Sequence, residues 1–139
     1  MAEDVLVDAG FLVALLSGRD THHRWAATRA ANLPPPWQTC EAVLSEAFHL
    51  LGSRGRPALT ALLRRDALRS RFDFESEQEP VLKLMHRYAA VPMSFADACL
   101  VRMTEKLASC RILTTDADFR IYRRHGRQVV PCELPSGAR

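Results

Sequence analysis

Short apolar runs of β character alternate with helical segments along nearly the whole chain. The strand-like runs lie at residues 5–7, 37–39, 72–74, 112–113 and 129–130. Stretches with a helical period of apolar residues fall between them, at residues 11–16, 25–30, 43–51, 59–63, 82–88 and 100–108. This alternation predicts an α/β fold with a mostly parallel central sheet of about five strands, covered by helices on both faces.

The length of the chain fits a single folding unit. A chain of 139 residues with 47% apolar and 25% charged residues is long enough to bury a core and unlike a disordered sequence. We see no internal repeat and no linker, so we expect one domain over residues 1–139, ending in a loose tail. Within it, the glycines and proline of residues 52–57 are expected to separate two helices.

Nothing in the N-terminal sequence resembles a signal for export. The first residues are acidic where a secretory signal would be basic, and the apolar run at residues 11–16 is too short to cross a membrane. The four cysteines show neither zinc-site nor disulfide spacing, which favours reduced, buried thiols. We therefore expect a cytoplasmic protein without a membrane partner.

Two aspartates directly follow strand-like runs. Asp8 ends the first run, and Asp116 follows the run at residues 112–113. Open α/β sheets place their functional sites outside the carboxyl ends of the strands, so both side chains are candidates for such a site. Each could equally be an N-cap of the helix that comes next, since aspartate often accepts a hydrogen bond from the first turn.

Two further carboxylates lie on predicted helices. Glu46 falls at the border of its helix's apolar stripe and is expected to face partly inward, although its long stem could also carry the charge outward. Asp97 shares a helix face with Leu100 and Val101, which predicts that it is buried. The alternative for Asp97 is a capping box with Ser94 at the N-cap.

The joint placement of these four acids favours a metal site. Two unit negative charges about 4 Å apart repel by roughly 4 kcal/mol at an effective dielectric constant near 20. Acids gathered at one sheet edge therefore need a cation, or raised pKa values that keep some of them protonated. Because no histidine or cysteine has a spacing that would join them, the all-oxygen set suits Mg²⁺ or Mn²⁺.

Four segments of the chain together resemble the motifs of the PIN-domain ribonucleases, particularly the VapC-type toxins of toxin–antitoxin modules. Residues 5–16 with 20–23 are similar to the opening of that domain, and residues 39–47 to its second motif, which contains a metal-site glutamate. Residues 94–98 are similar to the third motif and residues 113–119 to the fourth. The order and spacing of these motifs cover the chain from residue 8 to residue 130.

The resemblance implies a metal-dependent endoribonuclease that cleaves RNA phosphodiester bonds with Mg²⁺ or Mn²⁺ as cofactor. It implies that catalysis and metal binding fall to Asp8, Glu46, Asp97 and Asp116, with Asp118 as a variable fifth acid and Thr114 lining the site. It also implies an RNA substrate, a homodimer and a small antitoxin that covers the acidic groove. The alternative is a non-catalytic PIN-like module that binds RNA or protein.

The basic residues of the chain are mostly arginines gathered in two clusters. The net charge of +3 is mild, but arginine's planar fork suits phosphate. We expect Arg64, Arg65 and Arg120 to contact the RNA backbone, although such clusters can also be solvated helix faces. His22 and His23 are expected to be structural.

A receiver-type phosphoacceptor domain also combines an α/β fold with aspartates at strand ends. It would need an acidic pair after the first strand and a lysine late in the chain. The only lysines here are Lys83 and Lys106, which disfavours that class.

Overall fold

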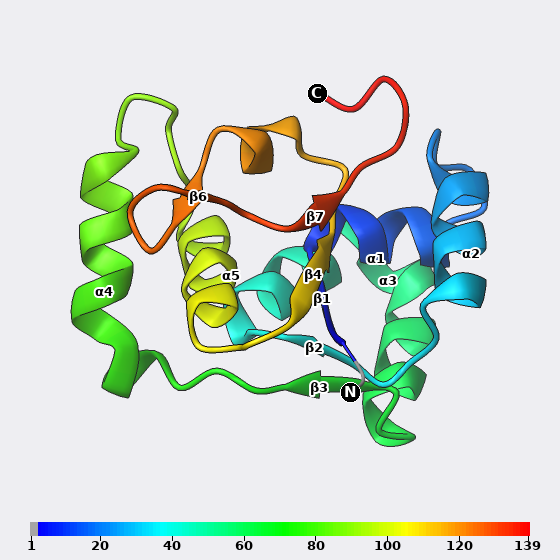
Figure 1. Ribbon diagram of the computed structural model, residues 1–139. Helices are drawn as coiled ribbons and strands as arrows, with labels where there is room; N and C mark the ends of the chain where they lie inside the picture. Colours follow the sequence, from blue (N-terminus) through cyan, green and yellow to red (C-terminus); the bar gives the residue numbers. More distant parts are fainter. Residues whose placement is uncertain (1–2) are drawn as a thin grey trace.

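A five-stranded parallel sheet forms the centre of the molecule (Figure 1). The computed structural model describes residues 3–139, so residues 1 and 2 of the predicted domain lie outside the described part. In sheet order the strands are β3 (Leu68–Ser70), β2 (Trp37–Thr39), β1 (Asp4–Val7), β4 (Cys110–Leu113) and β7 (Cys132–Glu133). The predicted α/β class is thereby confirmed.

Helices cover both faces of this sheet. They are α1 (Ala9–Leu16), α2 (His23–Asn32), α3 (Glu41–Arg64), α4 (Phe74–Arg87) and α5 (Phe95–Glu105), followed by a short 3-10 helix, η1 (Ala117–Arg120). Figure 1 shows α1, α2 and α3 on one side of the strands and α4 and α5 on the other. Because both faces are covered, the carboxyl ends of β1 and β4 are apolar without alternation, and Leu6, Val7, Ile112 and Leu113 are all fully buried.

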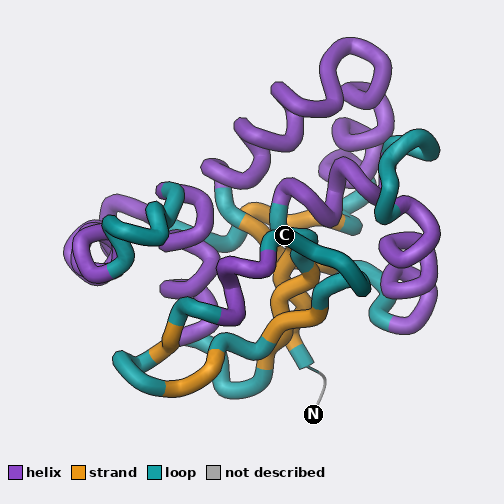
Figure 2. The backbone as a smooth tube through the Cα atoms, turned by 90° about the horizontal axis from the view of Figure 1, so that it is seen from above, coloured by secondary structure: helices purple, strands orange, loops and turns teal. Residues whose placement is uncertain are grey.

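The direction in which strands are added reverses beside β1. Along the chain, β2 and β3 are added on one side of β1, and β4 and β7 are then added on its other side. The adjacent strands β1 and β4 therefore flank the topological switch point, and Val7 pairs with Leu113 at their carboxyl ends. Sites in open α/β sheets form at such a point. Figure 2 looks down on this edge of the sheet, with the helices arranged around the strands.

The strand predicted at residues 72–74 is wrong. Phe74 begins α4, with Asp73 at the N-cap, and the third strand lies earlier, at Leu68–Ser70. Phe74 does not belong to the sheet. Its ring packs edge-on against that of Phe95, at 5.0 Å between centroids. This contact packs the start of α4 against the start of α5.

The strand predicted at residues 129–130 is only partly right. Gln128–Val129 forms β6, but it pairs antiparallel with β5 (Arg123–Arg124) in a separate two-stranded hairpin. The fifth strand of the main sheet is β7, which follows directly after Pro131. Its polar residue Glu133 is held there by ion pairs with Arg29, at 2.8 Å, and with Arg111.

The glycine-rich stretch interrupts α3, which consists of two helical segments that meet at a kink at Gly52. Gly52 has φ = 63° and ψ = -165°, a non-helical conformation that favours glycine, and the second helical segment runs from there to Arg64. Pro57 then lies near the start of the second part, where a missing N–H costs least. The prediction that residues 52–57 separate two helices is therefore confirmed.

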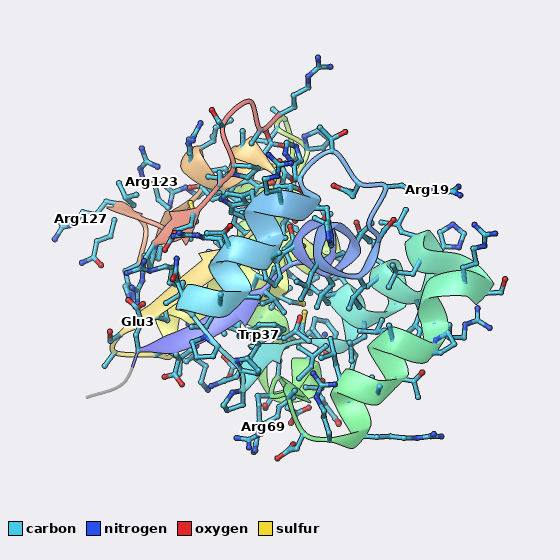
Figure 3. The ribbon with its side chains drawn as sticks, turned by 90° about the vertical axis from the view of Figure 1, so that its right-hand side faces the viewer. Glu3, Arg19, Trp37, Arg69, Arg123 and Arg127 are labelled. Atoms are coloured by element: carbon cyan, nitrogen blue, oxygen red, sulfur yellow. The ribbon has the colours of Figure 1, made fainter. Side chains whose placement is uncertain are left out.

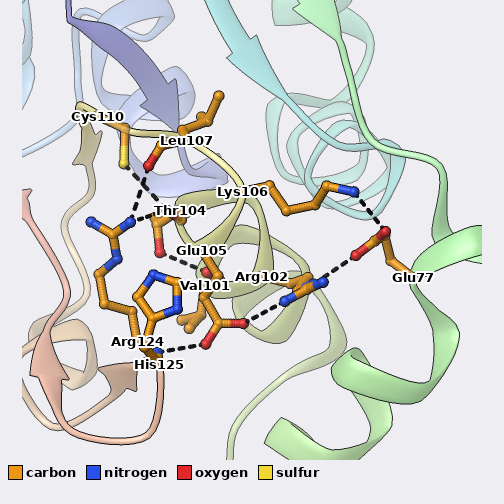
Figure 4. A network of polar contacts seen from close by, with 10 residues as sticks. All are labelled: Glu77, Val101, Arg102, Thr104, Glu105, Lys106, Leu107, Cys110, Arg124 and His125. Carbon is orange, nitrogen blue, oxygen red and sulfur yellow. Dashed lines mark hydrogen bonds and ion pairs between the residues drawn. The ribbon is translucent and has the colours of Figure 1, made fainter.

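A network of ion pairs joins α4 to α5 (Figure 4). The carboxylate of Glu77 on α4 accepts from Arg102 at 2.6 Å and from Lys106 at 2.8 Å, and Arg102 also contacts Glu105 at 3.2 Å. Only 10% of the Glu77 side chain is exposed, and its two cationic partners hold the pKa of that carboxyl below its ordinary value. Glu77 thus stabilises the fold in its charged form.

Replacing Glu77 with glutamine should lower the free energy of unfolding at pH 7 by about 2 kcal/mol, the range of a hydrogen bond to a charged group. Because folding lowers the pKa of Glu77, its contribution is present above pH 4.5 and is lost as the pH falls through the folded-state pKa. Urea unfolding of parent and Glu77→Gln at pH 7 and at pH 3 should therefore show a difference that shrinks in acid. Glu79→Gln, an exposed change on the same helix, is the control; an equal loss there, or a pH-independent difference, would contradict this prediction.

In the part of the chain that the structure describes, no helix combines the length and apolar character needed to span a bilayer.

Candidate metal centre

Two buried carboxylates lie at the edge of the sheet where β1 and β4 end. Asp8 directly follows β1 and is 6% exposed, and Asp97 lies in the first turn of α5 and is 7% exposed. Buried carboxylates are uncommon unless something compensates their charge. The surroundings of each therefore decide what this edge of the sheet can do.

Asp8 is both a helix cap and an acceptor for a neighbouring strand. Its Oδ1 accepts a hydrogen bond from the Ala9 amide at 2.7 Å, so the capping role considered from the sequence is real. Its Oδ2 accepts from the hydroxyl of Thr114 at 2.7 Å. Thr114 is fully buried and also accepts from the Asp116 amide at 3.0 Å, so one threonine joins the ends of β1 and β4.

Asp97 likewise combines a local cap with a long-range contact. Its amide donates to the hydroxyl of Ser94 at 3.0 Å, the first half of a capping box. Its Oδ2 accepts from the phenol of Tyr122 at 2.8 Å. The prediction that Asp97 is buried is confirmed, and its carboxylate takes part in more than helix capping.

The other two predicted acids are less buried. Asp116 is half-buried and caps η1, with Oδ1 accepting from the Asp118 amide at 2.9 Å. Glu46 is exposed on α3, and its charge still raises the pKa values of both Asp8 and Asp97. Asp118, the fifth acid, is half-buried in η1.

The acids still influence one another through their charges. Burial raises the pKa of Asp8 to about 7, against the hydrogen bond from Thr114, and the charges of Asp97 and Glu46 raise it further. Burial also raises the pKa of Asp97 to about 6, against the bond from Tyr122, and Asp116 and Glu46 add to this rise. The fold therefore brings the four predicted acids from four separate segments to one edge of the sheet.

Burial also raises the pKa of Asp116, and the neighbouring charge of Asp118 acts in the same direction. For the phenol of Tyr122, burial and the bond to Asp97 both raise the pKa above its ordinary value. Tyr122 thus remains a hydrogen-bond donor throughout the physiological pH range.

The donor chemistry at this edge fits a hard divalent ion. Among residues 3–139, no arginine, lysine or histidine forms an ion pair with Asp8, Glu46, Asp97 or Asp116. Within the same residues, no three acidic, histidine or cysteine side chains converge closely enough to form a ready metal-binding group. Carboxylate oxygens are nevertheless the donors that Mg²⁺ or Mn²⁺ prefers.

The predicted RNA-contacting arginines are divided between two parts of the molecule. Arg120 is exposed at the end of η1, the 3-10 helix that follows Asp116. Arg64 and Arg65 are exposed at the end of α3, before the amino end of β3, which is the opposite edge of the sheet. Figure 3 shows the same dispersion for other arginines, with Arg19, Arg69 and Arg127 on different sides of the molecule.

The two histidines lie near the acidic edge in different roles. The ring of His23 forms a hydrogen bond with the Ala14 carbonyl at 2.8 Å, which anchors α2 to α1 and agrees with a structural role. His22 lies in the loop before α2 and lines an open cavity of about 440 Å³ together with Thr115 and Arg139. This cavity adjoins the segment that carries Asp116.

Sequence reasoning missed Tyr122. No motif contains it, and it lies in a segment dominated by arginines, residues 120–127. The structure buries Tyr122 fully, and no pattern in the sequence indicated this.

A parallel α/β sheet with carboxylates gathered at its switch point defines the class of protein, and comparison with known proteins gives the family. A sequence model of the PIN domain matches residues 5–124, and the chain belongs to the PIN-domain family. The resemblance inferred from the four motifs is thereby confirmed.

One solved structure extends this relationship. The crystal structure of VapC20 from Mycobacterium tuberculosis, described as a sarcin–ricin loop cleaving toxin, is similar to this chain with a TM-score of 0.66 and 25% sequence identity. The match covers 78% of this chain and 87% of that one. A search of curated proteins found no match.

Proposed function

We propose that this protein is a metal-dependent endoribonuclease and the toxin of a toxin–antitoxin pair. The PIN-domain family and the similarity to the RNA-cleaving toxin VapC20 support a nuclease. The single observation that carries the proposal is the pair of buried carboxylates, Asp8 and Asp97, at the switch point of the sheet. With no cationic side chain paired to them in the described residues, their charge is suited to an added cation.

The residues of this edge divide the work between binding and orientation. Asp8 and Asp97 would hold Mg²⁺ or Mn²⁺ from the buried side, and Glu46 and Asp116 from the solvent side, directly or through water. Thr114 orients Asp8 through the hydrogen bond to its Oδ2. Asp118 lies beside Asp116 and would act as the outer fifth acid.

The substrate would approach from solvent over the carboxyl ends of the strands. Arg120 is exposed beside Asp116 and suited to bind a backbone phosphate, which gives salt-dependent binding with little sequence preference. The open cavity beside Thr115 leaves room for RNA at this edge. An ion bound by the acids would supply an activated water and neutralise charge that develops on the phosphate.

The proposal includes the partners that the resemblance implies. A small antitoxin would cover the acidic groove, the protein would act as a homodimer in the cytoplasm, and residues 1–139 would form one domain. Structured RNA is the substrate class, with the sarcin–ricin loop as the first sequence to try, since VapC20 cleaves it.

The test is cleavage of a sarcin–ricin loop oligonucleotide and a second structured RNA by the purified protein. We expect cleavage with Mg²⁺ or Mn²⁺, none with EDTA, and recovery when the ion is restored. Sequencing the new ends maps the cut. Equal cleavage in EDTA would refute metal dependence, and RNA binding without cleavage under every condition would favour the non-catalytic module.

A further inference from the structure

Tyr122 is a fully buried residue with a polar group aimed at the acidic edge. Its hydroxyl donates to Oδ2 of Asp97 at 2.8 Å across 25 residues of sequence. The residue lies two positions after the end of η1, the 3-10 helix that begins after Asp116, and its amide donates to the Asp118 carbonyl at 3.2 Å. One side chain therefore connects the segment of Asp116 and Asp118 to the helix of Asp97.

The ring of Tyr122 is held firmly by two other aromatic rings. The ring of Tyr88 packs edge-on against it at 5.2 Å between centroids, and the ring of Phe119 does so at 5.3 Å. Edge-to-face contacts at these distances are favourable and fix the orientation of a ring. The phenol oxygen of Tyr122 is thus a rigid point from which to orient a carboxylate.

The arrangement repeats the one at the other buried acid. Asp8 Oδ2 receives a hydroxyl hydrogen bond from Thr114, and Asp97 Oδ2 receives one from Tyr122. A carboxylate held at one oxygen cannot turn freely about its terminal torsion, so its other oxygen keeps one direction. Hydrogen bonds to ligating side chains commonly orient them in this way and strengthen metal binding.

We propose that Tyr122 is a positioning residue that orients Asp97 for metal binding. This proposal rests on the proposed function, because it assumes that Asp97 holds the ion. Tyr122 itself touches neither RNA nor the ion and acts only through the carboxylate. A purely structural tyrosine would fill the same space without affecting the ion.

Tyrosine-to-phenylalanine variants separate the two roles. Tyr122→Phe removes the hydroxyl and keeps the ring with both of its edge contacts. Tyr88→Phe is the matched control, because its hydroxyl accepts from the Arg123 amide at 2.9 Å and makes no contact with the acids. Both residues are buried and their rings touch, so loss of either hydroxyl tests the same aromatic cluster.

Mn²⁺ affinity without RNA is the first measurement, by isothermal titration calorimetry on the intact protein. We expect Tyr122→Phe to weaken Mn²⁺ binding by about 10- to 100-fold, the usual effect of removing such a partner, and Tyr88→Phe to bind within about twofold of the parent. RNA cleavage should show a lower kcat for Tyr122→Phe at unchanged KM. In an Asp97→Asn background, removal of the Tyr122 hydroxyl should change Mn²⁺ affinity no further.

A second measurement follows Tyr122 directly and needs no change at that residue. The chain contains two tyrosines, so in Tyr88→Phe the signal of ¹³C-labelled tyrosine belongs to Tyr122 alone. Saturating Mg²⁺ should shift this signal as Asp97 binds the ion.

The outcomes separate failure of this inference from failure of the proposed function. A parent protein that neither binds Mn²⁺ nor cleaves RNA overturns the proposed function. A parent that does both, with Tyr122→Phe equal to it in Mn²⁺ affinity, overturns only the role of Tyr122. An unshifted Tyr122 signal at saturating Mg²⁺, or an equal loss of Mn²⁺ affinity in the Asp97→Asn background, would also overturn it.

Discussion

The Asp97→Asn protein is expected to cleave RNA on the order of 1,000-fold more slowly than the parent, the scale at which loss of one preorganised electrostatic group lowers kcat. Asparagine keeps the shape of the side chain and can still accept from Tyr122, so the fold should persist. The change removes the negative charge that we propose holds the ion from the buried side. Single-turnover cleavage with Mn²⁺ measures the loss, and circular dichroism checks the fold.

A matched aspartate on the opposite edge of the sheet supplies the control. Asp66 is exposed, pairs with Arg69 and has φ = 63°, a conformation that asparagine also tolerates. Asp66→Asn should cleave like the parent. Asp8→Asn should lose activity as Asp97→Asn does, since asparagine can still cap α1. Full activity in either variant of the buried acids would show that the proposed site is not the catalytic one.

Without divalent ions, the protein should become less stable as the pH rises from about 4 to about 7.5. Folding raises the pKa of Asp8 to about 7 and of Asp97 to about 6, from 3.8 in both cases. In this window the folded state keeps protons that the unfolded chain has released, so raising the pH favours unfolding. For Asp8 alone the loss is at most about 4 kcal/mol, at 1.36 kcal/mol for each pKa unit.

Divalent ions should reverse this loss at pH 7.5, because an ion bound only to the folded state stabilises it. At a hundredfold excess over Kd the gain is about 2.7 kcal/mol, or roughly 10 °C in melting temperature for a chain of this size. Thermal melts with Mg²⁺, Mn²⁺ or K⁺ at equal ionic strength measure the effect. In metal-free buffer at pH 7.5, Asp97→Asn should melt at or above the parent temperature and gain little from Mg²⁺.

Two results would contradict this expectation. A parent whose metal-free stability is flat or rises between pH 4 and 7.5 would show that the buried carboxylates carry no penalty when charged. A large loss of stability in Asp97→Asn would assign Asp97 to helix capping alone. Asp66→Asn is again the control, because it should reproduce both the pH slope and the metal response of the parent.

The central strands could be predicted because their burial on both faces leaves a local signal. Val5, Leu6 and Val7 form a continuous apolar run, and Trp37–Thr39 is bounded by prolines before it and a helix after it. The edge strands carry no such signal. In β3 only Leu68 is buried, and β7 depends on Glu133, whose place is fixed by ion pairs from distant arginines.

The candidate site could be predicted only as far as its position on single elements. The face of α5 indicated that Asp97 is buried, and the end of the first strand run indicated Asp8. Tyr122 meets Asp97 through tertiary packing of three aromatic rings, which no local pattern specifies. Glu46 is exposed although it lies at the border of an apolar stripe, and periodicity does not determine how far a border residue is covered.

The hydrogen bond between Thr114 and Asp8 joins residues 106 positions apart. The acidic edge also requires Asp97 and Tyr122, so it exists only when nearly the whole chain has been made and packed. At about 5–20 residues per second, synthesis of this length takes on the order of ten seconds. During that time the nascent chain holds Asp8 without its hydroxyl donor and without the second buried acid. The proposed nuclease would therefore be inert until the segment that carries Tyr122 has been made and packed against α5.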